Sequence, residues 1–430
     1  MKKSLKLMFV MMLIFGVILA GCSGSSKGSS GKKDGVVELT WYFPIAVGGP
    51  LTSIIEKLAE DFHKENPDIK IKPVYTGTYD ETMTKVQTAI QGKTTPDLAV
   101  LLSTELFTLL DMDAVIPLDE YLDKAEGKDF YPAFMENSQT GGKTWSLPFQ
   151  RSTIVLYYNK DAFQQAGLDP EKPPANWAEL EEYSKKLVES GTKYGIEIPS
   201  TGFQYWMFQA LALQSGKNLM NEDGNEVYFN TPENVDALKY WLDLSQKHKV
   251  MPTGVVDWAT APSDFIEGNT AMLYHTTGNL TNIKNSAKFD FGVSFLPANK
   301  NYGSPTGGGN FYIFKGIPKE KQDAAWKFID WATSPERAAQ WSMDTGYVAT
   351  SKAAYETDVL KEYTESFPQA AVARDQLEYA AAELSTHSNG KIVKIINDNI
   401  QAALTGELSV EEALEKAQKE AEKVLAPYKK

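Results

Sequence analysis

Two kinds of residue in the sequence could in principle carry covalent or metal chemistry. Gly24 to Gly28 reads G-S-S-K-G and fits the nucleophile motif G-x-S-x-G, whose serine acts only on a turn between a strand and a helix. The surrounding sequence is rich in Gly, Ser and Lys instead. The four histidines, at positions 63, 248, 275 and 387, are far apart, and none forms a helical pair with a glutamate as zinc sites require. The sequence therefore predicts no catalytic residue, metal ion or cofactor.

Segments suited to binding, rather than to catalysis, follow the first three predicted strands. They span residues 43–49, 75–79 and 103–105. Ligands of parallel α/β sheets bind at the carboxyl ends of the strands, and the helices that follow offer unpaired N–H groups. Gly48 and Gly49 either allow a close approach of the backbone or form an ordinary turn. These segments predict a site for a small polar molecule.

The elements that must position this site alternate between strand and helix. The apolar pattern predicts strands near 37–41, 69–71 and 96–102 with helices over 51–65 and 83–91 between them, which makes the first lobe βαβαβ. A long strand over 147–160 is typical of a crossing between two lobes. Further elements are predicted after Asn176, over 269–280, 310–316 and 326–332, and after Ser409.

Length and charge exclude some classes of protein. The 430 residues include 43 basic and 56 acidic side chains and carry a net charge of −13. A body from Val36 onward is too long for one ordinary core and predicts two lobes. The acidic surface repels phosphate backbones, so nucleic acid is not an expected partner. The 20 Tyr, 20 Phe and 9 Trp suit a cleft for hydroxylated ligands as well as a core.

The N-terminal residues predict export. Lys2, Lys3 and Lys6 precede an apolar run from Leu7 to Ala20, which is typical of a secretory signal peptide over residues 1–21. Small residues precede Cys22, the only cysteine, as in the lipobox of bacterial lipoproteins, so we expect Cys22 to carry a lipid such as palmitate. Residues 22–35 are then a flexible tether. The alternative is a structural cysteine after an uncleaved transmembrane helix, although the apolar run is shorter than the roughly 20 residues that a span needs.

Several stretches of the body, in this order, resemble the extracellular solute-binding proteins of family 1 that serve ABC importers, and most closely the glycerol-3-phosphate-binding members. They are FHKENPDIKI (62–71), TYDETM (78–83), PFQRSTIVLYYNKDAFQQAGLDPEKPPANWAELEEYSKKL (148–187), GNTAMLYHTTGNLTNI (268–283), PERAAQWSMDTGYVATSKAAY (335–355) and TGELSVEEAL (405–414). No single stretch is decisive, but their joint order and spacing are specific.

The resemblance implies an α/β fold of two lobes, the periplasmic-binding-protein or Venus-flytrap fold, with a hinge of crossing segments. We expect residues 36–147 and 278–325 in the N-terminal lobe and residues 148–277 and 326–430 in the C-terminal lobe. The implied function is to capture a sugar, an oligosaccharide or a glycerol phosphate ester and deliver it to the permease subunits of an ABC importer. The protein would be a monomer, held by its lipid at the outer face of the bacterial cell membrane.

Carried over residue by residue, the resemblance implies a set of ligand-binding positions. They are Tyr79, Ser103, Arg151, Ser152, Phe203, Trp206, Thr276, Thr277, Gly307, Gly308 and Tyr347. The chain departs from the family at three of the family's positions: Ser103 replaces an acidic residue, Phe203 replaces a tryptophan, and Val393 replaces a phosphate-holding arginine. Lys391, Lys394 and Arg151 are possible substitutes for that arginine, but lysine lacks its bidentate fork.

A rival class is an exported carbohydrate-active hydrolase, because acidic residues are plentiful and a two-lobed cleft would suit it. Glycoside hydrolysis needs two carboxylates across one bond. The named cleft segments carry Ser, Thr, Tyr, Trp and Gly far more than Asp or Glu. The sequence therefore favours a binding protein.

Overall fold

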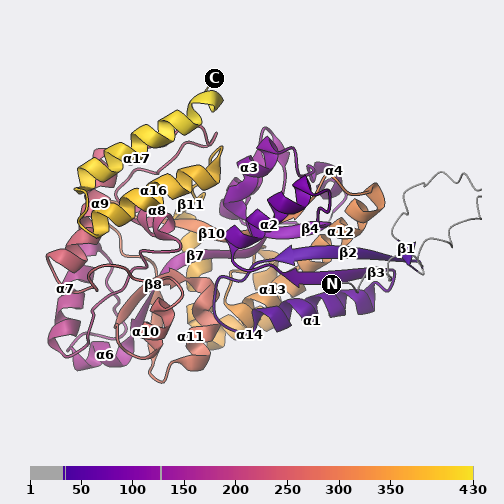
Figure 1. The fold of residues 1–430 in the computed structure, drawn as a ribbon. Helices are drawn as coiled ribbons and strands as arrows, with labels where there is room; N and C mark the ends of the chain where they lie inside the picture. Colours follow the sequence, from indigo (N-terminus) through magenta and orange to yellow (C-terminus); the bar gives the residue numbers. More distant parts are fainter. Residues whose placement is uncertain (1–31, 34, 126–127, 430) are drawn as a thin grey trace, which may run out of the picture.

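The computed structural model describes residues 32–33, 35–125 and 128–429. Cys22, the predicted signal peptide and most of the predicted tether lie outside these residues. The described chain forms two lobes that lie side by side, and each lobe combines strands with covering helices (Figure 1). Within the described residues, no helix combines the length and the apolarity that a bilayer crossing requires.

The first lobe contains the predicted βαβαβ unit. Its strands are β2 (Val36–Phe43), β3 (Ile69–Tyr75) and β4 (Leu98–Leu102), and β2 pairs in parallel with both of the others. Helix α1 (Leu51–Glu65) connects β2 to β3, and α2 (Tyr79–Gln91) connects β3 to β4. Both helices end at the predicted residues, 65 and 91, and Asn66 and Gly92 are their C-caps. All five residues of β4 are buried, as expected for a central strand of a covered sheet.

Two long strands connect the lobes. β7 (Leu147–Asn159) is buried along its whole length, and its first half pairs antiparallel with β10 (Ser304–Ile313). Its second half pairs with β8 (Met272–Thr276) and β9 (Phe291–Ser294) in the second lobe, while β10 continues onto β4 of the first lobe. The prediction that 147–160 crosses between the lobes is therefore confirmed.

The start of β10 differs from the predicted strand at 310–316. The observed strand begins at Ser304 and includes Pro305 and Gly307 to Gly309. Proline and glycine weaken an intrinsic strand signal, but pairing with a neighbouring strand overrides it here. Gly308 has a φ of +94°, and a Cβ atom there would lie 1.8 Å from the Gln150 carbonyl oxygen. Only glycine fits at this contact.

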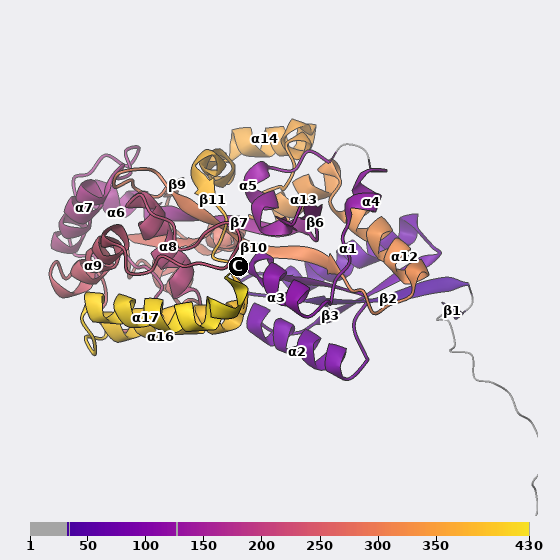
Figure 2. The ribbon, with the colours of Figure 1, turned by 90° about the horizontal axis from the view of Figure 1, so that it is seen from above.

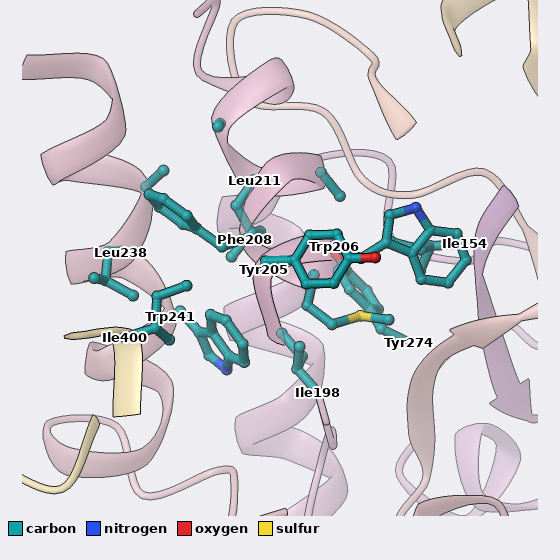
Figure 3. Packing of buried hydrophobic residues seen from close by; sticks show 14 of the residues in the cluster. Ile154, Ile198, Tyr205, Trp206, Phe208, Leu211, Leu238, Trp241, Tyr274 and Ile400 are labelled. Atoms are coloured by element: carbon teal, nitrogen blue, oxygen red, sulfur yellow. The ribbon is translucent and has the colours of Figure 1, made fainter. Parts of the chain in front are cut away.

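The second lobe is built around a buried helix, α8 (Gln204–Gln214), in which nearly every side chain is buried. A helix without a polar face must be enclosed on all sides. Its cover includes α9 (Pro232–Gln246) and α16 (Asn389–Leu404), and α17 (Val410–Leu425) packs in turn on these two helices. Figure 3 shows Phe208 of α8, Trp241 of α9 and Ile400 of α16 in one buried cluster, with Trp206 at the opposite end of the cluster from Leu238.

The remaining principal elements complete the two lobes. They are α3 (Leu106–Asp111), α4 (Asp119–Leu122), α5 (Pro132–Met135), β5 (Gln139–Thr140), β6 (Lys143–Thr144), α6 (Lys160–Gln165), α7 (Trp177–Glu189), α10 (Ala261–Ile266), α11 (Leu280–Ser286), α12 (Lys319–Ala332), α13 (Pro335–Thr345), α14 (Asp358–Ser366), α15 (Val372–Asp375) and β11 (Ala380–Ala381), with the short β1 (Lys32–Lys33) beside β2. The predicted capping residues Asn176 and Ser409 are the observed N-caps of α7 and α17.

The hydrophobic clusters bear on how the lobes divide. Ala325, Phe328 and Ile329 of α12 pack with Trp41 and Phe62 of the first lobe. Figure 2 likewise shows α12 beside β2 and far from α7 and α9. This packing differs from the prediction, which began the C-terminal lobe's second part at residue 326. The pairing of β9 with the second half of β7 also differs from the prediction, which put residues 278–325 in the N-terminal lobe. The remaining lobe boundaries stay predictions.

Candidate functional site

A small buried cavity lies where the two lobes meet the crossing strands, and we call it the deep cavity. It is lined by Ala46, Val47, Tyr79, Leu102, Ser152, Phe203, Trp206, Trp258, Thr276, Gly308, Tyr347 and Glu383. Its free volume is about 20 Å³, which is room for about one water molecule. Seven of the eleven predicted ligand-binding residues lie in this wall, although they come from segments nearly 270 residues apart in the chain.

Two larger spaces adjoin the deep cavity, and all three share Phe203. The first, the acidic opening, has a volume of about 560 Å³ and is lined by residues including Asp80, Glu105, Lys394 and Asp398. The second, the aromatic opening, has a volume of about 550 Å³. Its lining is Ile45, Ala46, Val47, Gly48, Thr78, Tyr79, Asp80, Gly202, Phe203, Asp257, Trp258, Ala259, Pro262, Ser263, Asn279 and Asn282. Each has the size of a small-molecule site.

The first lobe contributes Tyr79, the first residue of α2. The capping box of Thr78 and Glu81 begins the helix at this position and so fixes the backbone that carries the Tyr79 ring. The Tyr79 hydroxyl donates a hydrogen bond of 2.9 Å to the Gln150 Oε1 of β7. Burial raises the pKa of Tyr79 well above its ordinary value, so this hydroxyl stays protonated and keeps its hydrogen. The bond fixes the ring against the crossing strands.

The second lobe contributes two tryptophans, Trp206 from the first turn of the buried helix α8 and Trp258 from the irregular segment before α10. The Trp206 indole N–H donates to the Thr306 carbonyl of β10 at 2.9 Å, so α8 is anchored to a crossing strand. The Trp258 indole N–H donates to the Ala46 carbonyl of the first lobe at 2.9 Å. Phe203 packs beside both, 4.6 Å from the Trp258 ring and 6.5 Å from the Trp206 ring, and the two tryptophan rings are 6.1 Å apart. Such rings can pack on the apolar faces of a sugar.

A series of hydrogen bonds through His275 and Asn279 holds Trp258 on the side away from the deep cavity. His275 stacks on the Trp258 ring at 3.8 Å, and its Nε2 lies 3.1 Å from the Trp258 carbonyl oxygen. The Asn279 amide donates to His275 Nδ1 at 2.9 Å, and its oxygen accepts from the Gly48 N–H at 3.2 Å. Nε2 therefore carries the imidazole proton. Burial lowers the pKa of His275 to about 3, so it stays neutral and positions Trp258 without lining the deep cavity.

Four predicted residues do not line the deep cavity, and strand alternation explains two of them, Arg151 and Gly307. Neighbouring side chains in a strand point to opposite faces. Ser152 lines the cavity, so Arg151 turns away from it; Gly308 lines it, so Gly307 faces the Trp206 ring instead. Thr277 follows Thr276 in the turn after β8. Ser103 is fully buried at the end of β4.

Arg151 is held inside the protein by acceptors other than a ligand. Its Nη1 donates to the Gly308 carbonyl at 3.1 Å and to Asn310 Oδ1 at 3.3 Å, and its Nη2 donates to Thr306 Oγ1 at 2.9 Å. The guanidinium also lies 5.2 Å from the centre of the Phe134 ring. Burial lowers its pKa to about 10. Arg151 therefore ties β7 to β10 behind the cavity wall.

The sequence reasoning missed Trp258 and Glu383. Glu383 follows the two-residue strand β11, which pairs with β10 and returns the chain to the hinge. Its side chain is 1% exposed, and its Oε1 accepts from the Tyr205 hydroxyl at 2.7 Å. Burial raises the pKa of Glu383 to about 7, against the opposing effects of Tyr205 and the charge of Arg151. No periodic pattern or motif surrounds either residue.

Among the described residues, no three His, Cys, Asp or Glu side chains gather as a metal site would require. The deep cavity offers hydroxyls, aromatic rings and one carboxylate. This arrangement can bind a hydroxylated molecule by hydrogen bonds and ring stacking.

Comparison with known proteins assigns the family. The family model described as bacterial extracellular solute-binding protein matches residues 57–369. The sn-glycerol-3-phosphate-binding periplasmic protein UgpB of Escherichia coli strain K12 is 30% identical over 406 residues, covering 89% of this chain and 91% of that protein. The chain belongs to the bacterial extracellular solute-binding proteins. This confirms the predicted resemblance and a role in binding rather than in hydrolysis, and it places the solute-binding protein outside the cytoplasm.

Solved structures confirm the fold of this solute-binding protein. UgpB from Mycobacterium tuberculosis in complex with glycerophosphocholine superimposes with a TM-score of 0.82, at 24% identity, over 92% of this chain and 99% of that one. Maltose-bound MalE3 of T. maritima gives a TM-score of 0.81, at 24% identity, over 90% and 100%. The predicted two-lobe α/β fold is therefore correct.

Proposed function

We propose that this protein captures a small hydroxylated solute between its lobes and delivers it to the permease of an ABC importer. The solute is a sugar, an oligosaccharide or a glycerol phosphate ester, as the names of the similar proteins indicate for those proteins. The observation that carries the proposal is the composition of the deep cavity, where Tyr79 of the first lobe, Ser152 and Gly308 of the crossing strands, and Trp206 of the second lobe meet.

The same geometry suggests how binding is signalled. The lobes contact each other through single hydrogen bonds at the cavity rim, such as Trp258 to Ala46 and Asn279 to Gly48. The deep cavity has room for little more than a water molecule, so a solute enters only when the lobes move apart. A solute that touches both lobes then stabilises the closed form, which is the form that a membrane partner can distinguish.

We propose further that the mature protein is a monomer anchored to the outer face of the cell membrane by a lipid on Cys22. The short apolar run, the small residues before Cys22 and the tether of residues 22–35 support this. Replacing Cys22 with Ser should release the protein from the membrane fraction into the medium or periplasm. Retention of the Cys22→Ser protein in the membrane would contradict the anchor.

The test of the proposed function is thermal unfolding of the purified protein with a panel of solutes. The panel contains sn-glycerol-3-phosphate, glycerophosphocholine, maltose-type and xylose-type oligosaccharides and simple hexoses. A solute at about a hundred times its dissociation constant stabilises the folded state by about 2.7 kcal/mol, which gives a clear shift. Trp206→Phe should reduce the shift, whereas Tyr302→Ala, at a surface ring that is 40% exposed, should not. A panel without any shift would contradict the proposal.

A further inference from the structure

The one charged side chain in the wall of the deep cavity is a carboxylate. Glu383 is almost fully buried, and only its Oε1 has a hydrogen-bond partner within the described residues, the Tyr205 hydroxyl at 2.7 Å. Its Oε2 accepts no hydrogen bond from any described residue. A buried carboxylate oxygen without a donor is costly, and here that oxygen belongs to a residue of the cavity wall. A solute that donates a hydrogen bond to it would remove this cost.

Among the described residues, no unpaired cation lines the deep cavity or its two openings to balance this carboxylate. Of the described residues that line the three spaces, Lys394 is the one Lys or Arg, and its ammonium pairs with Asp398 at 2.8 Å. Lys391, the other lysine that could have replaced the arginine, does not line them. The remaining charged lining residues, Asp80, Glu105 and Asp257, are acidic.

Arg151 does not supply the missing cation to a solute. Its two terminal nitrogens already donate to oxygens of β10, and it is absent from the cavity wall. The positive charge of Arg151, which lies behind the cavity wall, lowers the pKa of Glu383 and so favours its charged form. A phosphate in front of Glu383 would still meet a like charge in a site that excludes water.

Resting on the proposed function, we infer that Glu383 makes the deep cavity selective for uncharged hydroxylated solutes and excludes phosphate esters. A sugar hydroxyl donates to the free Glu383 oxygen, while the rings of Trp206, Trp258 and Tyr347 cover the apolar faces of the sugar. The phosphate group of an ester is mostly ionised at neutral pH, so it offers Glu383 a like charge in place of a donor, and it needs several cationic donors itself. Neutral oligosaccharides are therefore the preferred class within the panel.

The experiment compares dissociation constants, measured by calorimetry at pH 8, for neutral solutes and for phosphate esters. The probes are maltose-type and xylose-type oligosaccharides, the pair of glucose and glucose 6-phosphate, and sn-glycerol-3-phosphate. The wild-type protein should bind its best neutral solute at least about a hundredfold more tightly than any phosphate ester. Glu383→Gln keeps the shape of the side chain and removes its charge. It should therefore lower the ratio of the phosphate-ester dissociation constant to the neutral-solute dissociation constant at least about tenfold, which corresponds to 1.4 kcal/mol.

The control variant is Glu197→Gln. Glu197 is also buried, with an exposed fraction of 2%, and one of its oxygens likewise has no hydrogen-bond partner in the described part of the chain, but it lines none of the three spaces. Its replacement should leave the ratio unchanged. Preference of the wild-type protein for a phosphate ester, or an unchanged ratio in folded Glu383→Gln, would overturn the inference and leave the proposed function standing. Failure of every probe to bind would overturn both.

Discussion

The wall of the deep cavity and the interior of the second lobe contain the same kinds of buried residue in different settings. Trp206 and Glu383 lie in the cavity wall, whereas Trp241 and Glu197 lie in the interior. Each carboxylate is buried with one oxygen that has no partner among residues 32–33, 35–125 and 128–429, and burial raises the pKa of each to about 7. Burial and a shifted pKa therefore do not by themselves identify a binding residue. The two regions differ in that Trp206 and Glu383 line the deep cavity, whereas Trp241 and Glu197 do not.

The largest expected effects come from the two tryptophans. Trp241 is fully buried among the side chains of α8 and α9, so Trp241→Ala should lower the free energy of unfolding by about 3–5 kcal/mol. Its solute dissociation constant should stay within about threefold of the wild-type value, because distant sites act independently. Trp206→Phe should do the reverse and weaken binding at least tenfold with a smaller loss of stability, since the ring is shortened and its bond to Thr306 is lost.

Urea unfolding and calorimetric titration of the two variants measure both quantities. The comparison between the regions fails if Trp241→Ala weakens binding as strongly as Trp206→Phe does.

A second pair of residues tests the contact between the crossing strands. Gly308 and Gly254 have nearly the same φ, +94° and +92°, but a Cβ atom at Gly254 would meet nothing within 4 Å. Gly254→Ala should therefore cost about 1 kcal/mol for the left-handed backbone alone. Gly308→Ala adds a collision with the Gln150 carbonyl and should lower the free energy of unfolding by roughly 3 kcal/mol or more. It should also abolish solute binding. Equal losses in urea unfolding would show that β7 and β10 can move apart freely.

A third prediction concerns pH. The pKa of Glu383 is about 7 in the folded protein, against an ordinary value of 4.5, so the folded state holds this proton more tightly. The resulting stabilisation is complete below pH 4.5 and is lost as the pH rises through 7, up to about 3 kcal/mol. Glu383→Gln should remove this loss between pH 5 and pH 8, and Glu197→Gln should remove a similar one. A pH dependence identical to wild type in urea unfolding of Glu383→Gln would show that the carboxyl group titrates normally.

Much of the scaffold could be predicted from local pattern. The βαβαβ unit, the crossing strand at 147–160 and the caps at Asn176 and Ser409 all depend on residues close together in the sequence. β10 was predicted too short because its glycines and proline hide a strand that only pairing with β7 creates. Long-range pairing of this kind leaves no local signal.

The cavity could be predicted only in part, for a related reason. Resemblance identified segments such as 151–152 and 276–277, but strand alternation and turn geometry decide which residue of each pair faces the cavity. Trp258 and Glu383 lie in irregular segments that the fold brings to the hinge, where hydrogen bonds to Ala46 and from Tyr205 fix their side chains. Sequence spacing carries no information about such distant partners.

The most direct test of the account is a crystal structure of the protein with the solute that gives the largest thermal shift. The account predicts that the solute lies between Tyr79 of the first lobe and Trp206 of the second, with a hydroxyl group within hydrogen-bond distance of Glu383. A solute bound outside the deep cavity and its two openings, or in contact with one lobe only, would contradict it.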